Sequence, residues 1–403
     1  MTDPTVRPTT LFVNVGHTYA HLVMLLYPTA VLALEGQWGL GYAELLPLGF
    51  AGYLLFGIGS LPAGWLADRW HSGHMMSLFF LGTGASALLT GLAFGPWSLA
   101  AGLTLIGIFA SIYHPVGIAW LVGASERPGR VLGVNGVYGA VGIGAAGLIA
   151  GVLSDLISWR AAFLVPGIVC LATGVAFSLG VASGRLTMVR AGYRPSEAPP
   201  TRGQARRGLF MLFGSILFAG LIFQMTSVGM PKIFQDRLGD VIGLSATAAG
   251  SLVSVVYLIS ALGQIVGGAL ADRHDERWLY ALSYALQMAL LGVAAYTFGL
   301  LLFPLLALAV AVQTGTQPIE NCLIARYTPQ SWRATAYGAK FVLALGLSAL
   351  GVPLIAAIYG ATGSFVGVFL VMVACCIVPI LVGFGLPRRA PGPAMAPAGE
   401  PAE

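Results

Sequence analysis

Five ionisable side chains lie inside long apolar stretches of this sequence, where such groups are costly. They are His17, His21, His114, Glu320 and Lys340. A charged side chain at the centre of a membrane-spanning helix costs about 2.5–3.5 kcal/mol on insertion scales, so these residue types are retained there mainly for function or as partners of one another. His17 and His21 are four residues apart and would share one face of a helix. The five side chains are therefore candidates for binding a solute or carrying a proton.

Several kinds of chemistry are open to these residues. A histidine titrates near a pH of about 6.5 and can carry a proton, and we expect this role for His21 and His114. His17 could instead be hydrated or hydrogen-bonded to a neighbouring helix, and Glu320 and Lys340 could form a structural ion pair. A histidine pair could also hold a metal, but transition-metal sites use more ligands and no carboxylate or thiolate lies nearby in the sequence. We predict no metal and no cofactor.

The elements that position these residues are membrane-spanning helices. The 403 residues are 57% hydrophobic and only 9% charged, whereas a soluble domain carries about 25% charged residues. Apolar stretches of about 20 residues recur, each long enough to cross a hydrocarbon core of about 30 Å, and the alternation of a barrel strand is missing. The sequence predicts an all-α membrane protein of twelve spans, at 11–34, 45–67, 75–95, 97–122, 131–154, 160–182, 209–231, 246–270, 278–298, 300–325, 335–359 and 364–386.

One long polar segment divides the chain into two halves. Residues 183–208 are rich in arginine and proline and are expected to form a basic cytoplasmic linker. We predict an N-terminal six-helix bundle at 1–182, a C-terminal bundle at 209–387 and a disordered tail at 388–403. With the N-terminus inside, 16 of the 20 basic residues fall on the cytoplasmic side, as the positive-inside rule requires. Both termini are therefore predicted to be cytoplasmic.

The two halves repeat with an offset of 203 residues. His21 and Pro28 correspond to Gln224 and Pro231, and the dipeptide at 114–115 corresponds to Gln-Pro at 317–318. Two parallel six-helix repeats with the substrate site between them are a recurring plan of secondary transporters. Gln224 and Gln317 therefore join the five ionisable residues as candidates for a central substrate and proton cavity.

The chain resembles the major facilitator superfamily over nearly its whole length. The segment Gly64-Trp-Leu-Ala-Asp68-Arg69 is similar to that family's motif A, and Gly268-Ala-Leu-Ala-Asp272-Arg273 to a second copy. The segments at 111–117 and 130–133, together with the histidines of the first span, resemble the fosmidomycin-resistance-like branch of exporters. The resemblance implies alternating access between two bundles and proton-coupled export by antiport.

The resemblance also implies a cytoplasmic gate. In the family, the aspartate at the position of Asp68 contacts the start of the eleventh helix, where a carboxylate would complement the positive helix N-terminus. The expected gate residues are Gly64, Asp68, Arg69, Arg130, Asp272, Arg273 and Arg333.

These features favour a secondary transporter over other classes of membrane protein. An intramembrane enzyme is disfavoured because no HExxH motif or pair of catalytic acids occurs, and a sensor because no soluble domain is apparent. Four basic candidates against one Glu320 favour a small polar or anionic organic solute. Proton-coupled import or uniport of an organic anion, and metal-ion transport through the histidine pair, are the alternatives. We expect a monomer in the bacterial inner membrane, with protons and lipid as its other partners and no nucleic acid.

Overall fold

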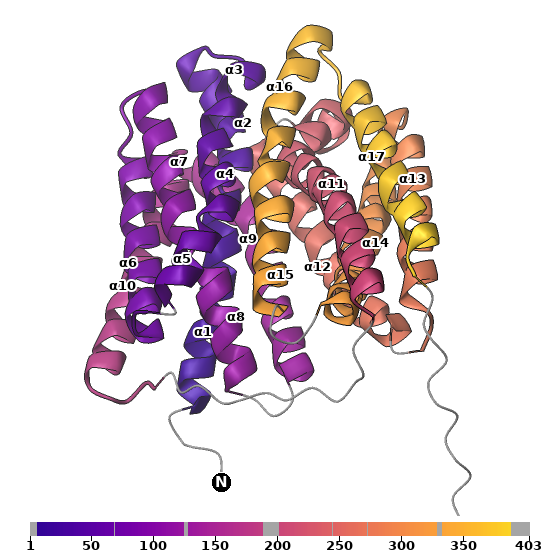
Figure 1. The fold of residues 1–403 in the computed structure, drawn as a ribbon. Helices are drawn as coiled ribbons and strands as arrows, with labels where there is room; N and C mark the ends of the chain where they lie inside the picture. The colour runs from indigo at the N-terminus through magenta and orange to yellow at the C-terminus, as the bar shows by residue number, and fades with distance from the viewer. Residues whose placement is uncertain are drawn as a thin grey trace, which may run out of the picture.

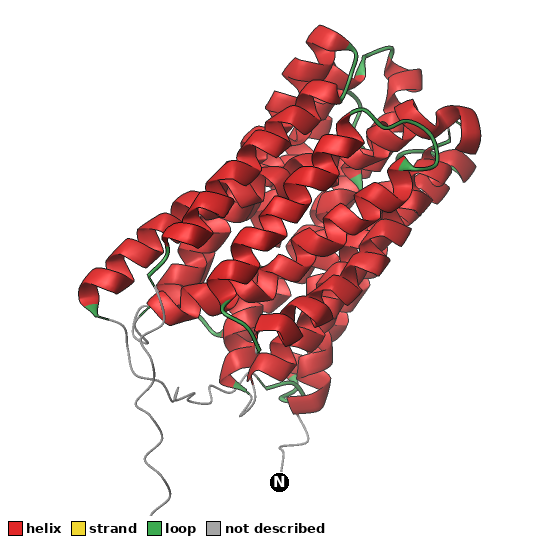
Figure 2. Ribbon diagram, turned by 90° about the vertical axis from the view of Figure 1, so that its right-hand side faces the viewer, coloured by secondary structure: helices red, strands yellow, loops and turns green. Residues whose placement is uncertain are grey.

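The computed structural model describes residues 6–67, 69–124, 128–187, 201–243, 245–271, 273–328 and 333–387. These residues are almost entirely helical, and no strand occurs among them (Figure 2). The helices run side by side, with the first half of the chain on one side of the molecule and the second half on the other (Figure 1). We call the face at which the chain begins the N-terminal face and the other the opposite face.

The first half contains six spans, several of which are interrupted. Its helices are α1 (Val6–Leu25), α2 (Tyr27–Trp38), α3 (Tyr42–Leu45), η1 (Leu46–Gly49), α4 (Phe50–Ile58), α5 (Ser60–Ala67), α6 (Ser72–Gly91), α7 (Pro96–Ala110), α8 (Tyr113–Gly123), α9 (Pro128–Leu156) and α10 (Ala161–Ala182). The first span is α1 with α2, the second runs from α3 to α5, and the fourth is α7 with α8.

The second half repeats this plan. Its helices are α11 (Arg202–Ile242), α12 (Ala246–Ala271), α13 (Glu276–Ala295), α14 (Leu302–Tyr327), α15 (Arg333–Phe341), the π-helical turn η3 (Val342–Gly346), the 3-10 turn η4 (Leu347–Leu350), α16 (Gly351–Thr362) and α17 (Val366–Gly385). The eleventh span is continuous from α15 to α16, with η3 and η4 in its middle.

Eleven helical segments of the described chain are long and apolar enough to cross a membrane. The twelfth is α6, which packs between α7 and α10. A Cβ at Gly84 of α6 would lie 2.7 Å from the backbone nitrogen of Leu171 in α10, so these two helices approach with their backbones nearly in contact. The fold class predicted from the sequence, an all-α protein of about twelve spans, is confirmed.

The seventh span starts earlier than the sequence analysis placed it. Helix α11 begins at Arg202, so residues 202–208 are helical rather than part of the linker. Thr201 caps the helix: its hydroxyl accepts from the backbone nitrogen of Gln204, whose side chain reaches back to Thr201. This capping box supplies the partners that the first turn of a helix lacks. Residues 188–200 of the linker and the tail at 388–403 lie outside the described residues.

Glycines bring the two halves together between α9 and α12. A Cβ at Gly147 would lie 2.8 Å from the carbonyl oxygen of Gly250, and a Cβ at Gly151 would lie 2.5 Å from that of Ala246. Backbones can approach this closely only where side chains are missing, which is how small residues serve helix packing in membranes. The second and eleventh spans meet in the same way at Gly57 and Gly346.

Polar contacts also join the halves toward the opposite face. Lys232 forms an ion pair of 2.9 Å with Glu35, and the backbone nitrogen of Thr247 donates to Asp155 at 2.7 Å. The Tyr42 hydroxyl donates to the carbonyl oxygen of Val228 at 3.4 Å. The opposite face is therefore held together by contacts that must break if the halves are to separate there.

Replacing Gly250 by valine is expected to weaken this closed arrangement. A Cβ at Gly250 would lie 2.0 Å from the carbonyl oxygen of Gly147, and such overpacking costs about 1–3 kcal/mol. The test introduces a cysteine at the buried Ser254 of this contact, in a Cys322→Ser background, and measures how fast a maleimide labels it. A destabilisation of the closed contact by about 1 kcal/mol should raise the rate of labelling by about fivefold or more. Gly214→Val is the control, since a Cβ at Gly214 meets no atom within 4 Å. Equal labelling in both variants would contradict the prediction.

Candidate functional site

Three of the predicted residues, His17, His21 and His114, form a cluster in the first half, which we call the histidine triad. The Nε2 atoms of His17 and His21 are 3.1 Å apart. Their ring centroids lie 4.9 Å from each other and 5.4 and 5.3 Å from that of His114. His114 is only 3% exposed, and the other two are partly buried. The structure thus brings together residues from the first and fourth spans, 93 or more positions apart in the sequence.

Hydrogen bonds fix the protonation of two rings in the triad. His17 Nδ1 lies 2.7 Å from the backbone carbonyl oxygen of Asn135. A carbonyl oxygen only accepts, so His17 Nδ1 carries the proton and a neutral His17 presents a lone pair at Nε2. His21 Nε2 must then donate to it. His114 Nδ1 is buried and has no partner among the described residues. In the neutral state, protons therefore point from His21 to His17 and from His17 to the α9 backbone.

A polar network that the sequence analysis missed holds the triad in place. The Asn135 side chain donates to Asn14 Oδ1 at 2.9 Å and to the Tyr113 hydroxyl at 2.7 Å. The Tyr113 ring stacks on that of His17 at 4.9 Å and 17°. Both asparagines are buried within apolar spans, and this was the signal available in the sequence.

Local backbone features position the rings. A Cβ at Gly139 would lie 2.6 Å from His17 Cε1, so the missing side chain makes the space that the imidazole fills against α9. The fourth span is interrupted between Ala110 and Tyr113, directly before His114. Pro115 follows, and a proline within a helix removes a backbone hydrogen bond. Interrupted helices at mid-membrane depth are typical of transporter binding sites.

Glu320 and Lys340 form a buried ion pair in the second half. Lys340 Nζ lies 2.8 Å from Glu320 Oε1, and the two side chains are 5% and 4% exposed. Lys340 also donates to Asn321 Oδ1 at 2.6 Å and, at 3.4 Å, to Gln317 Oε1. The ammonium group thus has three acceptors, which is the number of hydrogens it can donate.

The carboxylate has a partner besides the lysine. The Tyr280 hydroxyl donates to Glu320 Oε2 at 3.4 Å and lies 2.7 Å from Ser215 Oγ. A buried ion pair is stable only where its remaining donors and acceptors are also satisfied. Glu320, Lys340 and Gln317 were predicted as site residues from the sequence, whereas Asn321 and Tyr280, which add the remaining polar contacts, were not.

One ring contact between the two halves joins the histidine triad to the residue beside the ion pair. The ring of Phe341, the residue after Lys340, lies 4.9 Å from that of His114. Phe56 of α4 lies 5.4 Å from His114 on the first half's side. The π-helical turn η3 starts directly after Phe341, and such turns inside helices often mark functional sites. Phe341 therefore links the histidine triad of the first half to the helix that carries Lys340 in the second half.

Gln224 joins neither group. It is buried in α11, and its stem lies beside Gly351, where an added Cβ would be 3.7 Å from Gln224 Cβ and Cγ. Its Nε2 has no partner among the described residues. The repeat therefore placed Gln317 near the other candidates, whereas Gln224 packs against α16.

The gate motif is described only in part. Asp68 and Asp272 lie outside the described residues, and the side chains of Arg130 and Arg333 are not described either. Arg69 stacks on Trp65 at 4.0 Å, and Arg273 is exposed. A Cβ at Gly64 would lie 3.3 Å from Pro115 Cβ, so this motif glycine allows α5 to pack against α8, the helix of His114.

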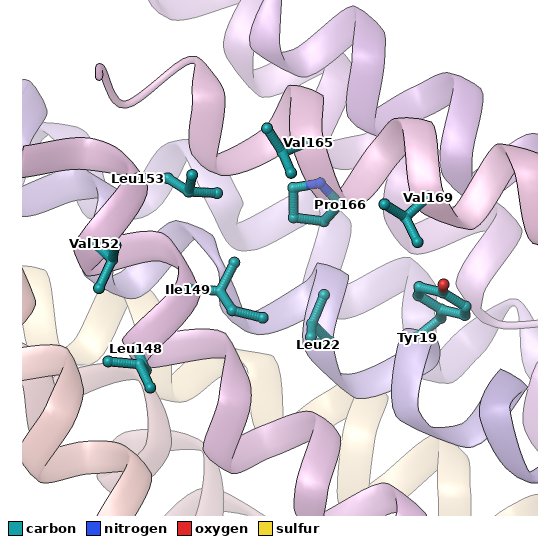
Figure 3. Close-up of a pocket in the computed structure, with 9 residues that line it drawn as sticks. All are labelled: Tyr19, Leu22, Leu148, Ile149, Val152, Leu153, Val165, Pro166 and Val169. Atoms are coloured by element: carbon teal, nitrogen blue, oxygen red, sulfur yellow. The ribbon is translucent and has the colours of Figure 1, made fainter. Parts of the chain in front are cut away.

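A cavity of about 600 Å³ lies between α1, α9 and α10, and none of the predicted site residues lines it (Figure 3). Its lining is apolar apart from the Tyr19 hydroxyl, and all of it comes from the first half. That hydroxyl already has a hydrogen-bond partner in Thr173, and no charged group in the lining would recognise an anionic solute.

Curated proteins similar to this chain are transporters and resistance proteins. A gallate transporter of Pseudomonas putida is 25% identical over 356 residues, which are 78% of this chain and 76% of the relative. A puromycin resistance protein of Streptomyces alboniger is 35% identical over 116 residues, or 28% of this chain and 22% of the relative.

Solved transporters share the fold. A bacterial homologue of the human lysosomal transporter Spinster, in an inward-facing and occupied conformation, superposes with a TM-score of 0.74 at 14% identity, covering 95% of this chain and 96% of that one. The outward conformation of the transporter FucP gives a TM-score of 0.63 at 14% identity, covering 96% and 100%.

The sequence pattern of the Major Facilitator Superfamily matches residues 15–239 and 212–402. This family consists of transporters and not of enzymes, so the expectation of a transporter is confirmed, while the fosmidomycin-resistance-like branch stays a prediction. With nearly the whole chain matched, this multi-pass membrane protein belongs to the Major Facilitator Superfamily.

Proposed function

We propose that this transporter moves a small organic anion together with a proton by alternating access of its two halves. The observation that supports the proposal is the buried ion pair between Lys340 and Glu320 at 2.8 Å. A buried ammonium group is the natural binding partner of a carboxylate or phosphonate. In the structure, the carboxylate that pairs with the Lys340 ammonium group is that of Glu320.

Protonation of Glu320 would let the carboxylate of a solute replace that of Glu320 as the partner of Lys340. A neutral Glu320 no longer compensates Lys340, and an uncompensated buried charge is strongly unfavourable. An anionic solute entering from the site between the halves would restore neutrality, so proton and anion bind together. When Glu320 loses its proton, it reclaims Lys340 and displaces the solute. This sequence of events gives symport of one proton with one negative charge.

The proposed solute class also agrees with one relative. The Pseudomonas putida protein that is 25% identical over 78% of this chain is named a gallate transporter, and gallate is an aromatic carboxylate. The rings of Phe56 and Phe341 beside His114 offer apolar faces for such a solute. We propose an orientation with the N-terminal face cytoplasmic, in a bacterial inner membrane, and a monomer as the functional unit.

Proton-coupled export by antiport is the second candidate. It is favoured by the 35% identity over 116 residues to the puromycin resistance protein and by the resemblance to exporters noted from the sequence. An antiporter of this kind would bind solute and proton alternately. In such a cycle a cationic solute would compete with Lys340 for Glu320.

Transport by the purified chain in liposomes separates these candidates. We expect hydroxybenzoates and phosphonates to accumulate inside vesicles whose lumen is more alkaline than the medium, because the proton gradient then drives symport inward. Collapsing the gradient with an ionophore should return the internal concentration to that outside. A cationic dye should show no such accumulation. Accumulation of the dye in vesicles of the opposite gradient, without movement of the anions, would overturn the proposal in favour of antiport.

A further inference from the structure

The histidine triad has the composition of a metal site as well as that of a polar cluster. Its three side chains each offer one ligand nitrogen, and these nitrogens all lie within 4.8 Å of one another. We propose that the triad binds a late divalent transition metal, with Zn²⁺ as the reference ion, through His17, His21 and His114. Imidazole is a ligand for zinc, cobalt, nickel and copper, whereas magnesium and calcium require oxygen ligands.

Two of the ligand atoms already have the spacing that a metal requires. Nitrogens that each lie about 2.0–2.1 Å from one tetrahedral zinc are about 3.3 Å apart, and the Nε2 atoms of His17 and His21 are 3.1 Å apart. To complete the site, the ring of His114 must move closer to the Nε2 atoms of His17 and His21. Its Nδ1 gives up no hydrogen bond to a described residue in this movement. Three histidines and one open position are the arrangement of many zinc sites.

The hydrogen bonds around the triad suit metal binding. The Nδ1–H of His17 donates to the Asn135 carbonyl oxygen at 2.7 Å, which leaves the Nε2 lone pair directed at the cluster. Metal-bound histidines almost always donate their other ring nitrogen in this way, and the contact fixes the ring. His21 binds the metal once its proton moves from Nε2 to Nδ1. All three imidazoles bind as neutral ligands, so the histidines themselves release no proton.

The charge of the site determines its fourth ligand. Among the described residues, the group that surrounds this position contains three histidines and no carboxylate or thiolate. The bound ion would keep its full positive charge in a buried position, which is unfavourable without a counter-ion. The fourth position should therefore take hydroxide, chloride or the carboxylate of a solute.

Cobalt provides a spectroscopic test that is independent of transport. Titrating the full-length chain in detergent with Co²⁺ should give a visible absorption band typical of tetrahedral cobalt, saturating at one ion per chain and disappearing when Zn²⁺ is added. His17→Gln and His114→Gln should each weaken binding by about tenfold or more, because the loss of an outer-shell partner alone already costs about 10–100-fold. Thermal unfolding of each variant shows whether it is folded.

The matched control is the second histidine pair of the chain. The exposed His71 and His74 have ring centroids 5.3 Å apart at the N-terminal face, and His71→Gln with His74→Gln should leave the cobalt band unchanged. Loss of the band in this control, or a wild-type chain that shows no saturable band, would overturn the proposal. Because the band does not depend on solute movement, this outcome is distinguishable from a failure of the proposed symport.

Discussion

Replacing Lys340 by methionine is expected to abolish transport of organic anions and to lower the free energy of unfolding by about 3–5 kcal/mol, the cost of leaving one partner of a buried pair without compensation. Lys340 and Glu320 are 5% and 4% exposed, so water cannot take the place of the missing partner. Thermal and denaturant unfolding in detergent measure the stability, and uptake into liposomes measures the transport.

The double variant Glu320→Gln with Lys340→Met distinguishes folding from function. With both charges removed, most of the lost stability should return, because apolar or neutral replacements of a buried pair are often no less stable than the pair. Transport should not return, since the group that attracts the anion is still missing. Recovery of transport in the double variant would show that Lys340 has only a structural role.

Lys232→Met is the matched control, since Lys232 is the other lysine of the chain. Its pair with Glu35 is 11% and 24% exposed, so solvent reaches it more than the Lys340 pair, and pairs screened by solvent contribute less, down to about 0–1 kcal/mol when they are fully exposed. This variant should unfold nearly as the wild type does. A loss of stability equal to that of Lys340→Met would mean that the depth of the Glu320 pair has no special effect.

Much of the fold could be predicted because membrane spans obey simple rules. Long apolar stretches must be helical, since every backbone polar group in lipid needs a partner within the helix. The repeat of 203 residues then related the two halves. The early start of α11 was missed because composition marked 202–208 as linker, although Thr201 and Gln204 are spaced as a capping box.

The candidate site was predicted in part because ionisable residues are rare in apolar spans. Spacing placed His17 and His21 on one face, and cost arguments selected His114, Glu320 and Lys340. The partners could not be predicted, because which residue of one helix faces another depends on how each helix is rotated. The Asn135 carbonyl oxygen comes within hydrogen-bond distance of His17 because Gly139 leaves room for the imidazole against α9.

Gln224 shows the limit of reasoning from the repeat. The sequence register made Gln224 the counterpart of His21, but the stem of Gln224 lies against Gly351. Gly351 belongs to the eleventh span, which has a π-helical and a 3-10 turn in its middle. The span that corresponds to it in the first half, the fifth span α9, is a continuous helix. The two halves therefore differ in local backbone geometry where the sequence alone predicts equivalence.

Replacing Glu320 by glutamine is expected to separate exchange of the anion from its accumulation. The amide oxygen can still accept from Lys340, which also keeps Asn321 and Gln317 as acceptors, so the hydrogen bonds of the site remain. The charge of Lys340 is no longer compensated, which lowers the stability of the variant and favours binding of the anionic solute. An amide carries no titrating proton. Exchange of labelled for unlabelled solute should therefore continue, while accumulation driven by a proton gradient should stop.

The expected accumulation of the anion follows from the transport of one proton with each solute. One proton moving through one unit of pH supplies about 1.4 kcal/mol, which corresponds to a tenfold concentration ratio. The wild type should therefore accumulate a monovalent anion up to about tenfold per pH unit at one proton per solute, and Glu320→Gln should reach equal concentrations on both sides. Because charge movement cancels in this symport, a membrane potential alone should drive no uptake by the wild type.

The histidines are the alternative proton carriers, and a second variant distinguishes them from Glu320. The double variant His21→Gln with His114→Gln removes two titratable rings of the triad and keeps hydrogen-bonding side chains in their place. If Glu320 carries the proton, this variant should bind solute less well but still accumulate it to the ratio set by the gradient. If it instead loses accumulation while Glu320→Gln keeps it, the proton is carried by the triad, and the ion pair serves only to hold α14 against α15.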